Sequence, residues 1–277
     1  MDIETRFLIL SDTHGEVVPG VAEIPTVDVA IHCGDLIDES KIEEFRKAID
    51  LLKSIQAPLK LVIAGNHDFT LDKPIFQNKV TGNETLDTAL KMENGAVLKV
   101  YASPYTPSLS DWGFQFHPDK DHDFAIPGGI DVVIAHGPPH GILDYTDGEQ
   151  RAGYPGLFGS VARSRPKLHC FGHIHEGWGA RLVTWRKDVS QTPSHFTDIE
   201  NNESKVIEKL STMKKLKADM EELVEEKARK RSNLHCEGYI RTSHSTRNGC
   251  LIRTGFQTLF VNAAIQGTTD EYPTQLP

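Results

Sequence analysis

Five short polar clusters follow five apolar runs along the first two thirds of the chain, and this repeated pattern constrains the fold most strongly. The apolar runs are short and partly β-branched, as is typical of buried central strands. They are Phe7 to Leu10, Val29 to Ile31, Leu61 to Ala64, Val132 to Ala135 and Leu168 to Phe171. Loops at the carboxyl ends of strands converge in an open α/β sheet, so clusters that are distant in sequence can share one site.

The order of strands and helices indicates an α/β fold. After the second strand, Ser40 with Glu43 three residues later forms a capping-box signal that opens a helix. The apolar stripe of this helix is Ile42, Phe45, Ile49 and Leu52. A strand from Leu59 completes a βαβ unit, which favours a mostly parallel sheet with helices on its faces. Further helices are expected at about 84–92 and 156–165, a strand at 97–102 and a long ordered loop at 103–129.

The composition changes near Lys187, which indicates an insertion. Residues from about Ile199 to Ser232 are rich in Lys and Glu and predict one long amphipathic helix. The apolar positions at helical spacing are Val206, Leu210, Met213, Met220 and Val224. This helix near 199–232 either packs one face on the body or binds a partner or a second copy of the chain. Strand character returns at 251–253 and 259–263, so we expect one domain over 1–277 with a charged helical insertion at about 187–249.

Bulk properties narrow the class of protein. The 277 residues carry a formal net charge of -9, which argues against a general nucleic-acid binder. No apolar run is long enough to cross a bilayer, and the start of the chain does not resemble a signal peptide. The four cysteines show no CxxC spacing and are typical of reduced thiols. We therefore expect a cytoplasmic protein without membrane or general nucleic-acid partners.

The polar clusters offer ligands for divalent metal ions. Asp12 and His14 are separated by one residue, so both side chains project to the same side of an extended segment. Asp35 follows a glycine that allows a tight turn, and its two oxygens can bridge two ions. Histidine and carboxylate ligands without thiolates favour Mn, Fe or Zn. The candidate metal ligands are Asp12, His14, Asp35, Asn66, His136, His173 and His175.

These motifs resemble the five signature blocks of the calcineurin-like metallophosphoesterases. The blocks are Asp12-x-His14, Gly34-Asp35, Gly65-Asn66-His67-Asp68, His136 and Gly172-His173-x-His175. The stretches Ala102 to Pro107, His136 to Pro139 and Arg165 to Gly177 are similar to the branch containing the metallophosphoesterase-domain proteins. The resemblance covers roughly residues 5–186 and resumes near 250–265, while 187–249 has no recognised counterpart.

The resemblance implies a four-layer αββα sandwich of two mostly parallel or mixed sheets that hydrolyses phosphate esters. It implies two divalent ions, with Mn favoured over Fe and Zn. One ion would be held by Asp12, His14, Asp35 and His175, and the other by Asp35, Asn66, His136 and His173. His67 would protonate the leaving oxygen, and Asp68 would orient His67.

The sequence indicates the substrate less clearly than it indicates the type of reaction. We favour a phosphodiesterase that acts on a small, cyclic-nucleotide-like substrate. The alternatives are a phosphomonoesterase acting on a small metabolite and, in a different class, a metal-binding scaffold. Candidate substrate contacts are His140, Arg151 and Tyr105, the last with Trp112 and Phe116 as an aromatic wall. Arg151 could equally pair with Glu149 or Asp147, and the aromatic residues could instead cap a sheet edge.

Overall fold

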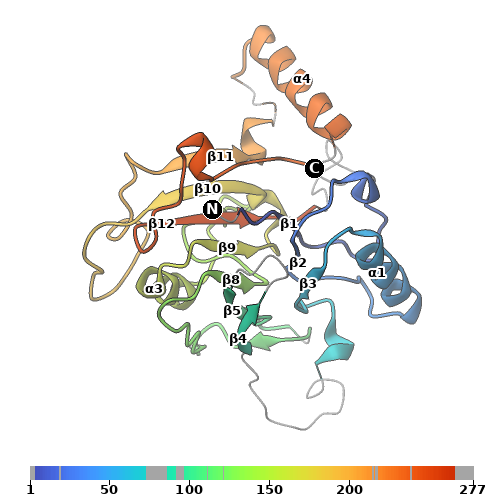
Figure 1. Ribbon diagram of the computed structural model, residues 1–277, viewed down its shortest axis with the longest axis horizontal. Coiled ribbons are helices and arrows are strands. Elements are labelled where there is room, and N and C mark those ends of the chain that lie inside the picture. The colour runs from blue at the N-terminus through green and yellow to red at the C-terminus, as the bar shows by residue number, and fades with distance from the viewer. Residues whose placement is uncertain are drawn as a thin grey trace.

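Two β-sheets pack face to face between α1 (Ile42–Ser54) and α3 (Pro155–Ser164) in the computed structural model (Figure 1). The structure describes residues 4–18, 20–72, 86–91, 97–110, 112–120, 122–213, 215, 218–237 and 239–265. The first sheet has the order β1-β2-β3 and is parallel throughout. Its strands are β1 (Phe7–Leu10), β2 (Val29–His32) and β3 (Leu59–Val62).

The second sheet is mixed and has seven strands in the order β11-β10-β12-β9-β8-β5-β4. Its four central strands run parallel: β5 (Val97–Ser103), β8 (Val132–Ala135), β9 (Leu168–Phe171) and β12 (Gln257–Asn262). The antiparallel outer strands are β4 (Leu86–Lys91), β10 (Gly179–Thr184) and β11 (Lys205–Lys209). A small third sheet pairs β6 (Thr106–Pro107) with β7 (Gln115–Phe116).

Alternating side chains on the strands build the four layers. On β2, Val29 and Ile31 pack against the second sheet, whereas Ala30 packs with Leu51 of α1. Successive side chains of a strand point to opposite faces, so one strand can serve two cores. The inter-sheet core also contains Val132 of β8, together with other apolar residues of both sheets.

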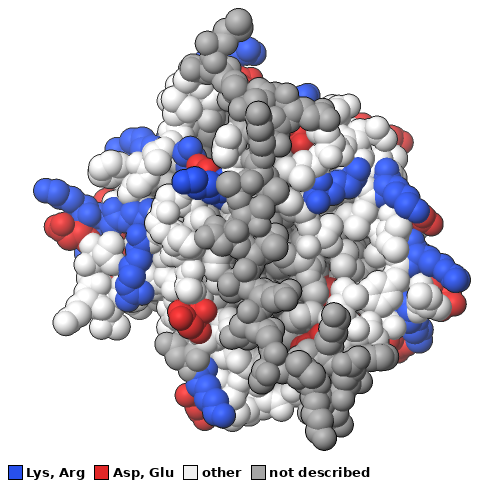
Figure 2. All heavy atoms as spheres, turned by 60° about the horizontal axis from the view of Figure 1, so that its bottom comes forward, with Lys and Arg blue, Asp and Glu red and all other residues white. Residues whose placement is uncertain are grey.

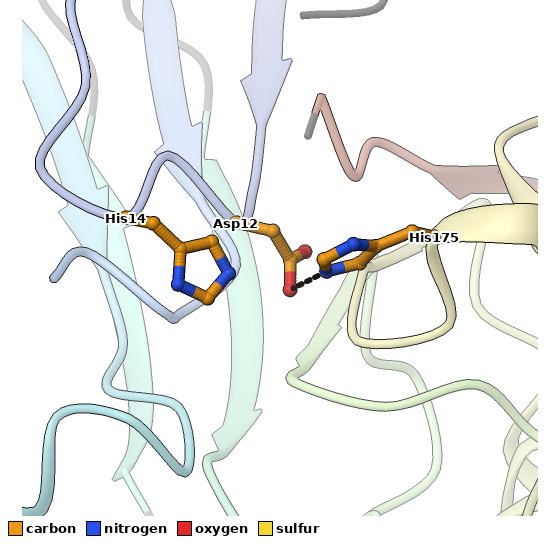
Figure 3. Close-up of side chains that lie close together, drawn as sticks. All are labelled: Asp12, His14 and His175. Atoms are coloured by element: carbon orange, nitrogen blue, oxygen red, sulfur yellow. Dashed lines mark hydrogen bonds and ion pairs between the residues drawn. The ribbon is translucent and has the colours of Figure 1, made fainter. Parts of the chain in front are cut away.

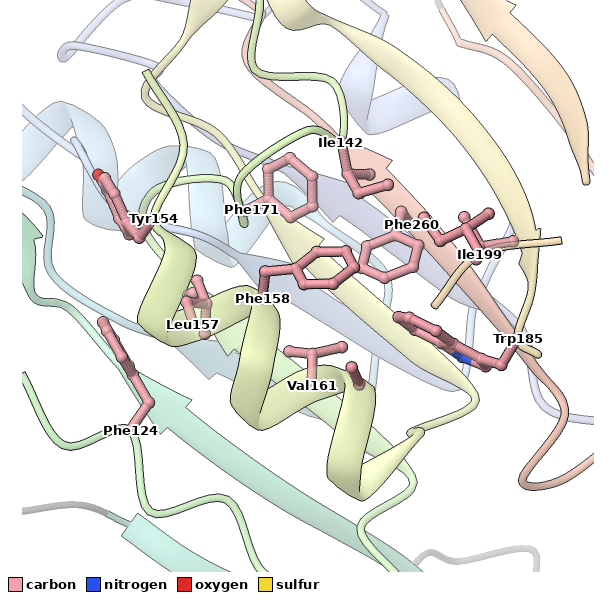
Figure 4. Packing of buried hydrophobic residues seen from close by; sticks show 13 residues of the cluster. Phe124, Ile142, Tyr154, Leu157, Phe158, Val161, Phe171, Trp185, Ile199 and Phe260 are labelled. Carbon is pink, nitrogen blue, oxygen red and sulfur yellow. The ribbon is translucent and has the colours of Figure 1, made fainter. Parts of the chain in front are cut away.

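The outer face of the second sheet is covered by α3. Leu157, Phe158 and Val161 of this helix lie on Phe171 of β9 and Phe260 of β12 (Figure 4). Pro155 at the first helical position has the fixed backbone angle that a helix start requires. The expected four-layer αββα arrangement is therefore confirmed, with α1 and α3 as its outer layers.

Two of the expected helices are wrong. Within the segment expected as a helix at about 84–92, the described residues form strand β4, which pairs with β5 over its full length. The hydrogen bonds that this segment makes to β5, at the edge of the sheet, override its local preference for a helix. The expected strand at 251–253 has no regular structure, whereas β12 confirms the strand at 259–263 apart from its last residue.

The long helix expected from Ile199 to Ser232 is also wrong. Lys205–Lys209 forms edge strand β11, a short 3-10 turn follows at Leu210–Thr212, and the helix α4 covers only Glu221–Glu237. Charged side chains suit an exposed edge strand as well as they suit a helix. In Figure 1, α4 projects from the rest of the chain, and Lys230 of α4 pairs with Glu208 of β11 at 2.8 Å. A partner-binding role and the single-domain organisation stay predictions.

Helix α1 begins later than its sequence signal indicates. Lys41 is the N-cap, and its N–H donates to Glu44 Oε2 at 3.1 Å, so the capping pair is shifted by one residue. The Ser40 hydroxyl instead donates to the backbone oxygen of His67 at 2.9 Å. The buried face contains Ala48 and Leu51 rather than the exposed Ile42 and Ile49 of the expected stripe.

The surface carries charges of both signs. Figure 2 shows one face, on which Lys and Arg side chains are spread around the rim beside Asp and Glu side chains. No helix in the described part of the chain has both the length and the apolar composition that a membrane span requires.

Candidate metal centre

All five polar clusters meet at the carboxyl ends of strands from both sheets. Asp12 follows β1, Asp35 follows β2, His136 follows β8, and His173 and His175 follow β9. An isolated parallel bridge between Ser11 and Ala264 joins the two sheets at this end. The clusters therefore form one site across the inter-sheet boundary, as the strand order predicts.

One group of candidate ligands consists of Asp12, His14 and His175, whose side chains converge in Figure 3. Their ligand atoms lie within 4.8 Å of one another, and His175 Nε2 is 3.3 Å from Asp12 Oδ1. Burial opposes ionisation of Asp12, but the hydrogen bond to His175 and the charges of the neighbouring histidines together outweigh it and lower the pKa of the carboxyl. Both buried ring nitrogens of His14 lack a hydrogen-bond partner within the described part of the chain. A metal ion in this group would bind one of the two nitrogens.

The second group consists of Asp35, His136 and His173, again with ligand atoms within 4.8 Å. His136 Nδ1 is 2.9 Å from the Cys33 backbone oxygen, so it donates its proton there. His136 Nε2 then faces Asn66 Oδ1 at 3.0 Å and Asp35 Oδ2 at 3.3 Å. Burial disfavours a charged His136, but Asp35 outweighs it and raises the pKa of His136 to about 9. The oxygens thus attract a cation to this position.

Asp35 lies between the two groups. Its Oδ2 is 3.3 Å from His136 Nε2 and 3.9 Å from His14 Nε2, while its Oδ1 accepts the His67 backbone N–H at 2.8 Å. One carboxylate is thereby placed to contact an ion in each group. The nitrogen and oxygen donors of both groups suit two divalent ions of the Mn, Fe or Zn type.

Four of the candidate ligands have positive φ angles, a backbone conformation that residues other than glycine rarely adopt. Asp12, His14, Asp35 and His173 have φ angles of 56°, 47°, 52° and 67°. Non-glycine residues with positive φ cost energy and cluster at functional sites. Gly172 is also constrained, since a Cβ there would lie 1.9 Å from Asp12 Oδ2. The loops are therefore shaped around the ligand positions at the expense of local backbone stability.

His67 lies at the edge of the site, and Asp38 orients its ring. The ring centroid is 4.7 Å from that of His14, and the His67 side chain is 23% exposed. His67 Nδ1 is 2.8 Å from the Asp38 backbone oxygen and 3.3 Å from Asp38 Oδ1. The orienting role expected of Asp68 is wrong. Sequence reasoning missed Asp38, although it stands only three residues after Asp35 on the same loop.

Asp68 has a structural role between two loops. Its carboxylate accepts backbone N–H groups of Gly65 at 2.7 Å and of Leu36 and Ile37 at 3.2 Å. Burial and the nearby Asp35 carboxylate raise the pKa of Asp68 to about 7, although these hydrogen bonds oppose the shift. Asp68 thereby fixes the Gly65 turn against the loop that carries Asp35.

The two polar residues expected to contact substrate are engaged within their own loop. Arg151 Nη1 donates to the buried Asp144 Oδ1 at 2.7 Å, a partner that the sequence did not indicate. His140 Nδ1 is 3.2 Å from the Gly153 backbone oxygen. The sequence did not indicate Asp144 as the partner of Arg151, because the burial of the Asp144 side chain depends on the tertiary structure.

The aromatic residues divide into two groups. Tyr105 packs against Phe114 and His122, with ring centroids 6.1 and 4.7 Å apart. Trp112 instead lies beside His67, with ring centroids 4.1 Å apart. Of the expected aromatic wall, Trp112 is thus the member in contact with the candidate catalytic residue, while Tyr105 belongs to a separate packed cluster.

The fold and this pair of ligand groups define a phosphoesterase-type metal centre, and the comparisons agree. The model of the calcineurin-like phosphoesterase family matches residues 5–177, and the chain belongs to this family. Metallophosphoesterase domain-containing protein 1 of Homo sapiens is 33% identical over 203 residues, which are 63% of this chain and 62% of that protein. The resemblance to this branch is confirmed.

Other similarities cover smaller parts of the matched proteins. A probable rhamnogalacturonate lyase C of Emericella nidulans is 35% identical over 192 residues, 65% of this chain and 18% of that protein. Among solved structures, purple acid phosphatase PPD1 from yellow lupin seeds matches with a TM-score of 0.40 and 13% identity, covering 66% of this chain and 39% of that one. The chain thus spans about three fifths of the length of the human relative and much less of the fungal one.

Proposed function

We propose that the chain hydrolyses a phosphodiester with two divalent metal ions, and that the substrate is small and nucleotide-like. The observation that carries the proposal is the position of Asp35 between two groups of ligands, with His67 beside them. When bound, two divalent ions lower the pKa of a water and neutralise the non-bridging oxygens of a phosphoryl group. The buried ring nitrogens of His14, which lack hydrogen-bond partners in the described part of the chain, and the histidine and carboxylate donors around them fit such ions.

The residues of the chain supply the remaining chemistry. A water oxygen forms a bond to phosphorus, the bond to the leaving oxygen breaks, and the proton of the water passes to solvent. His67 donates a proton to the leaving oxygen. Its Nδ1–H is held by the Asp38 backbone oxygen, which leaves Nε2 as the nitrogen that faces the substrate. The Asp38 carboxylate oxygen Oδ1 lies 3.3 Å from the same Nδ1, so both contacts hold the ring in this orientation.

The ion pair of Arg151 favours a diester over a monoester. A monoester dianion carries one more negative charge than a diester monoanion, and a further cation beside the metals would favour its binding. Arg151, the arginine expected at the mouth of the site, is already neutralised by Asp144 at 2.7 Å. A diester needs no such cation, so we propose diesters as the substrates.

The test compares bis-aryl and mono-aryl phosphates with the metal-loaded protein. We expect Mn-dependent turnover of the diester, which Asp35→Asn and His67→Ala reduce by about 10²-fold or more. Matched controls are Asp50→Asn, on an exposed position of α1, and His117→Ala, on an exposed loop, and both should keep full activity. Turnover of the monoester alone would exclude the diesterase assignment. Equal background rates in all variants would exclude hydrolysis at this site.

Manganese and a cytoplasmic location complete the proposal. Nitrogen and oxygen donors support Mn, and elemental analysis of protein purified without added metal tests it. Cys33, Cys170 and Cys250 are free thiols, as a reducing compartment requires. Fractionation of cells that express the full chain would test the location.

A further inference from the structure

Trp112 is a large apolar side chain that stays accessible at the edge of the metal centre. Its ring centroid lies 4.1 Å from that of His67, at an interplanar angle of 46°, and 6.1 Å from that of Phe69. The residue is nevertheless 37% exposed. The indole thus has two neighbouring rings and leaves part of its surface free, beside the residue proposed to donate the proton.

Backbone hydrogen bonds fix Trp112 in this place. The Gly113 N–H donates to the Asn66 backbone oxygen at 2.9 Å, and the Phe114 N–H donates to Asp72 Oδ2 at 2.7 Å. A Cβ at position 113 would lie 2.6 Å from the Phe69 Cα, so the two segments approach as closely as a glycine permits. The backbone next to Trp112 is therefore held against the segment that carries Asn66 and His67, which places the indole beside His67.

We propose that Trp112 binds a planar ring carried by the leaving group of the substrate. The inference rests on the proposed function, because His67 marks the side of the phosphorus from which the leaving group departs. A ring that stacks on the neighbouring indole belongs to the departing alcohol and not to the group that stays on phosphorus. The substrate class is thus a phosphodiester with a nucleoside as its leaving alcohol.

The size of the effect follows from aromatic stacking. A base stacked on an aromatic side chain gains roughly 10- to 100-fold in affinity. If Trp112 only supported His67, its removal would slow every substrate equally. A stacking surface instead affects only substrates whose leaving group carries a ring.

The kinetic experiment uses two methyl diesters with the same type of leaving alkoxide. One is methyl adenosine 5′-phosphate, and the other is the matching methyl ribose 5-phosphate diester without the base. We expect the intact, metal-loaded protein to favour the base-bearing diester by about 10- to 100-fold in kcat/KM. The expected products are adenosine and methyl phosphate. Trp112→Ala should reduce the preference to about 1 by lowering kcat/KM far more for the base-bearing diester than for the abasic one. Trp112→Phe should retain most of the preference, and the exposed control Phe256→Ala should retain all of it.

Three kinetic outcomes would overturn the inference. They are an equal loss on both substrates in Trp112→Ala, no preference in the intact protein, and release of methanol with adenosine monophosphate. Failure to hydrolyse any ester would instead refute the proposed function.

Fluorescence tests the stacking surface independently of activity. The chain has three tryptophans, and Trp178 and Trp185 are buried at 4% and 3% exposure, so an added ligand reaches Trp112 first. We expect adenosine to quench the fluorescence of the metal-loaded protein saturably, and Trp112→Phe to remove this response. No saturable quench, or the same quench in Trp112→Phe, would overturn the inference even if the protein hydrolyses diesters.

Discussion

Replacing Gly172 by alanine tests whether the loop after β9 is shaped around Asp12. The added Cβ would lie 1.9 Å from Asp12 Oδ2 and 2.2 Å from Ser11 Oγ, whereas carbon and oxygen rarely approach within 3.0 Å. Asp12 must therefore move by about 1 Å, a displacement that costs about 10²-fold in rate when it affects a catalytic group. The Asp12 carboxylate also accepts the His173 N–H at 3.0 and 3.1 Å, so the loop cannot shift without losing these bonds. Overpacking adds about 1 to 3 kcal/mol of destabilisation.

The assay combines metal content, turnover and urea denaturation of the same samples. Gly172→Ala should lose metal from the group of Asp12, His14 and His175 and fall about 10²-fold in Mn-dependent turnover. Gly128→Ala is the matched control, because a Cβ there meets nothing within 4 Å. It should keep its metal, its rate and its stability. Wild-type metal content and turnover in Gly172→Ala would refute the steric reasoning.

Three further predictions concern stability. Phe158→Ala removes a ring that is 1% exposed between α3 and the second sheet and should cost about 3 to 5 kcal/mol in urea denaturation, whereas Phe196→Ala, 73% exposed, should stay within about 0.5 kcal/mol. Chelation should lower the melting temperature and Mn²⁺ should restore it, because ions that bind only the folded state stabilise it by about 2.7 kcal/mol at 100 times their Kd; a Tm insensitive to both would count against the metal centre. Burial opposes ionisation of Asp198, but hydrogen bonds from Thr197 and Ser190 outweigh it and lower the pKa of this carboxyl. Its stabilisation is therefore present above the unfolded pKa of about 4 and is lost as the pH falls further, so Asp198→Asn should destabilise the protein at pH 7 and differ less from the wild type near pH 3.

Strong local patterns predicted the central part of the fold correctly. The apolar runs became β1, β2, β3, β8 and β9, and the segment at 156–165 became α3 with a shift of one residue. Strands β2, β8 and β9 are buried along their whole length, so their sequence is dominated by one requirement. The outer strands β4 and β11 of the second sheet were misassigned because neither contains a continuous apolar run of the kind that marks the central strands, and their charged residues fit helix and strand alike.

The sequence predicted which types of side chain form the site. It did not predict which carboxylate contacts His67 or which carboxylate pairs with Arg151. The Asp12 and Asp35 groups assembled as the motifs indicate. Which carboxylate orients His67 depended on how the loop after β2 folds back, and this brought Asp38 to the ring while Asp68 turned to backbone N–H groups. The pairing of Arg151 with Asp144 likewise depends on the burial of Asp144, which has no local sequence signal.

The five polar clusters after apolar runs were determined by the sequence alone, because strand hydrophobicity and ligand chemistry are both local properties of a few residues. The resemblance already implied that Asp35 is shared, but only the tertiary structure decided its distances to His14 and His136. Only the tertiary structure decided that Trp112 rather than Tyr105 lies beside His67. These neighbours come from different loops, and their distances are set by the packing of two sheets against each other. Contacts across that boundary depend on long-range backbone geometry, which no short stretch of sequence encodes.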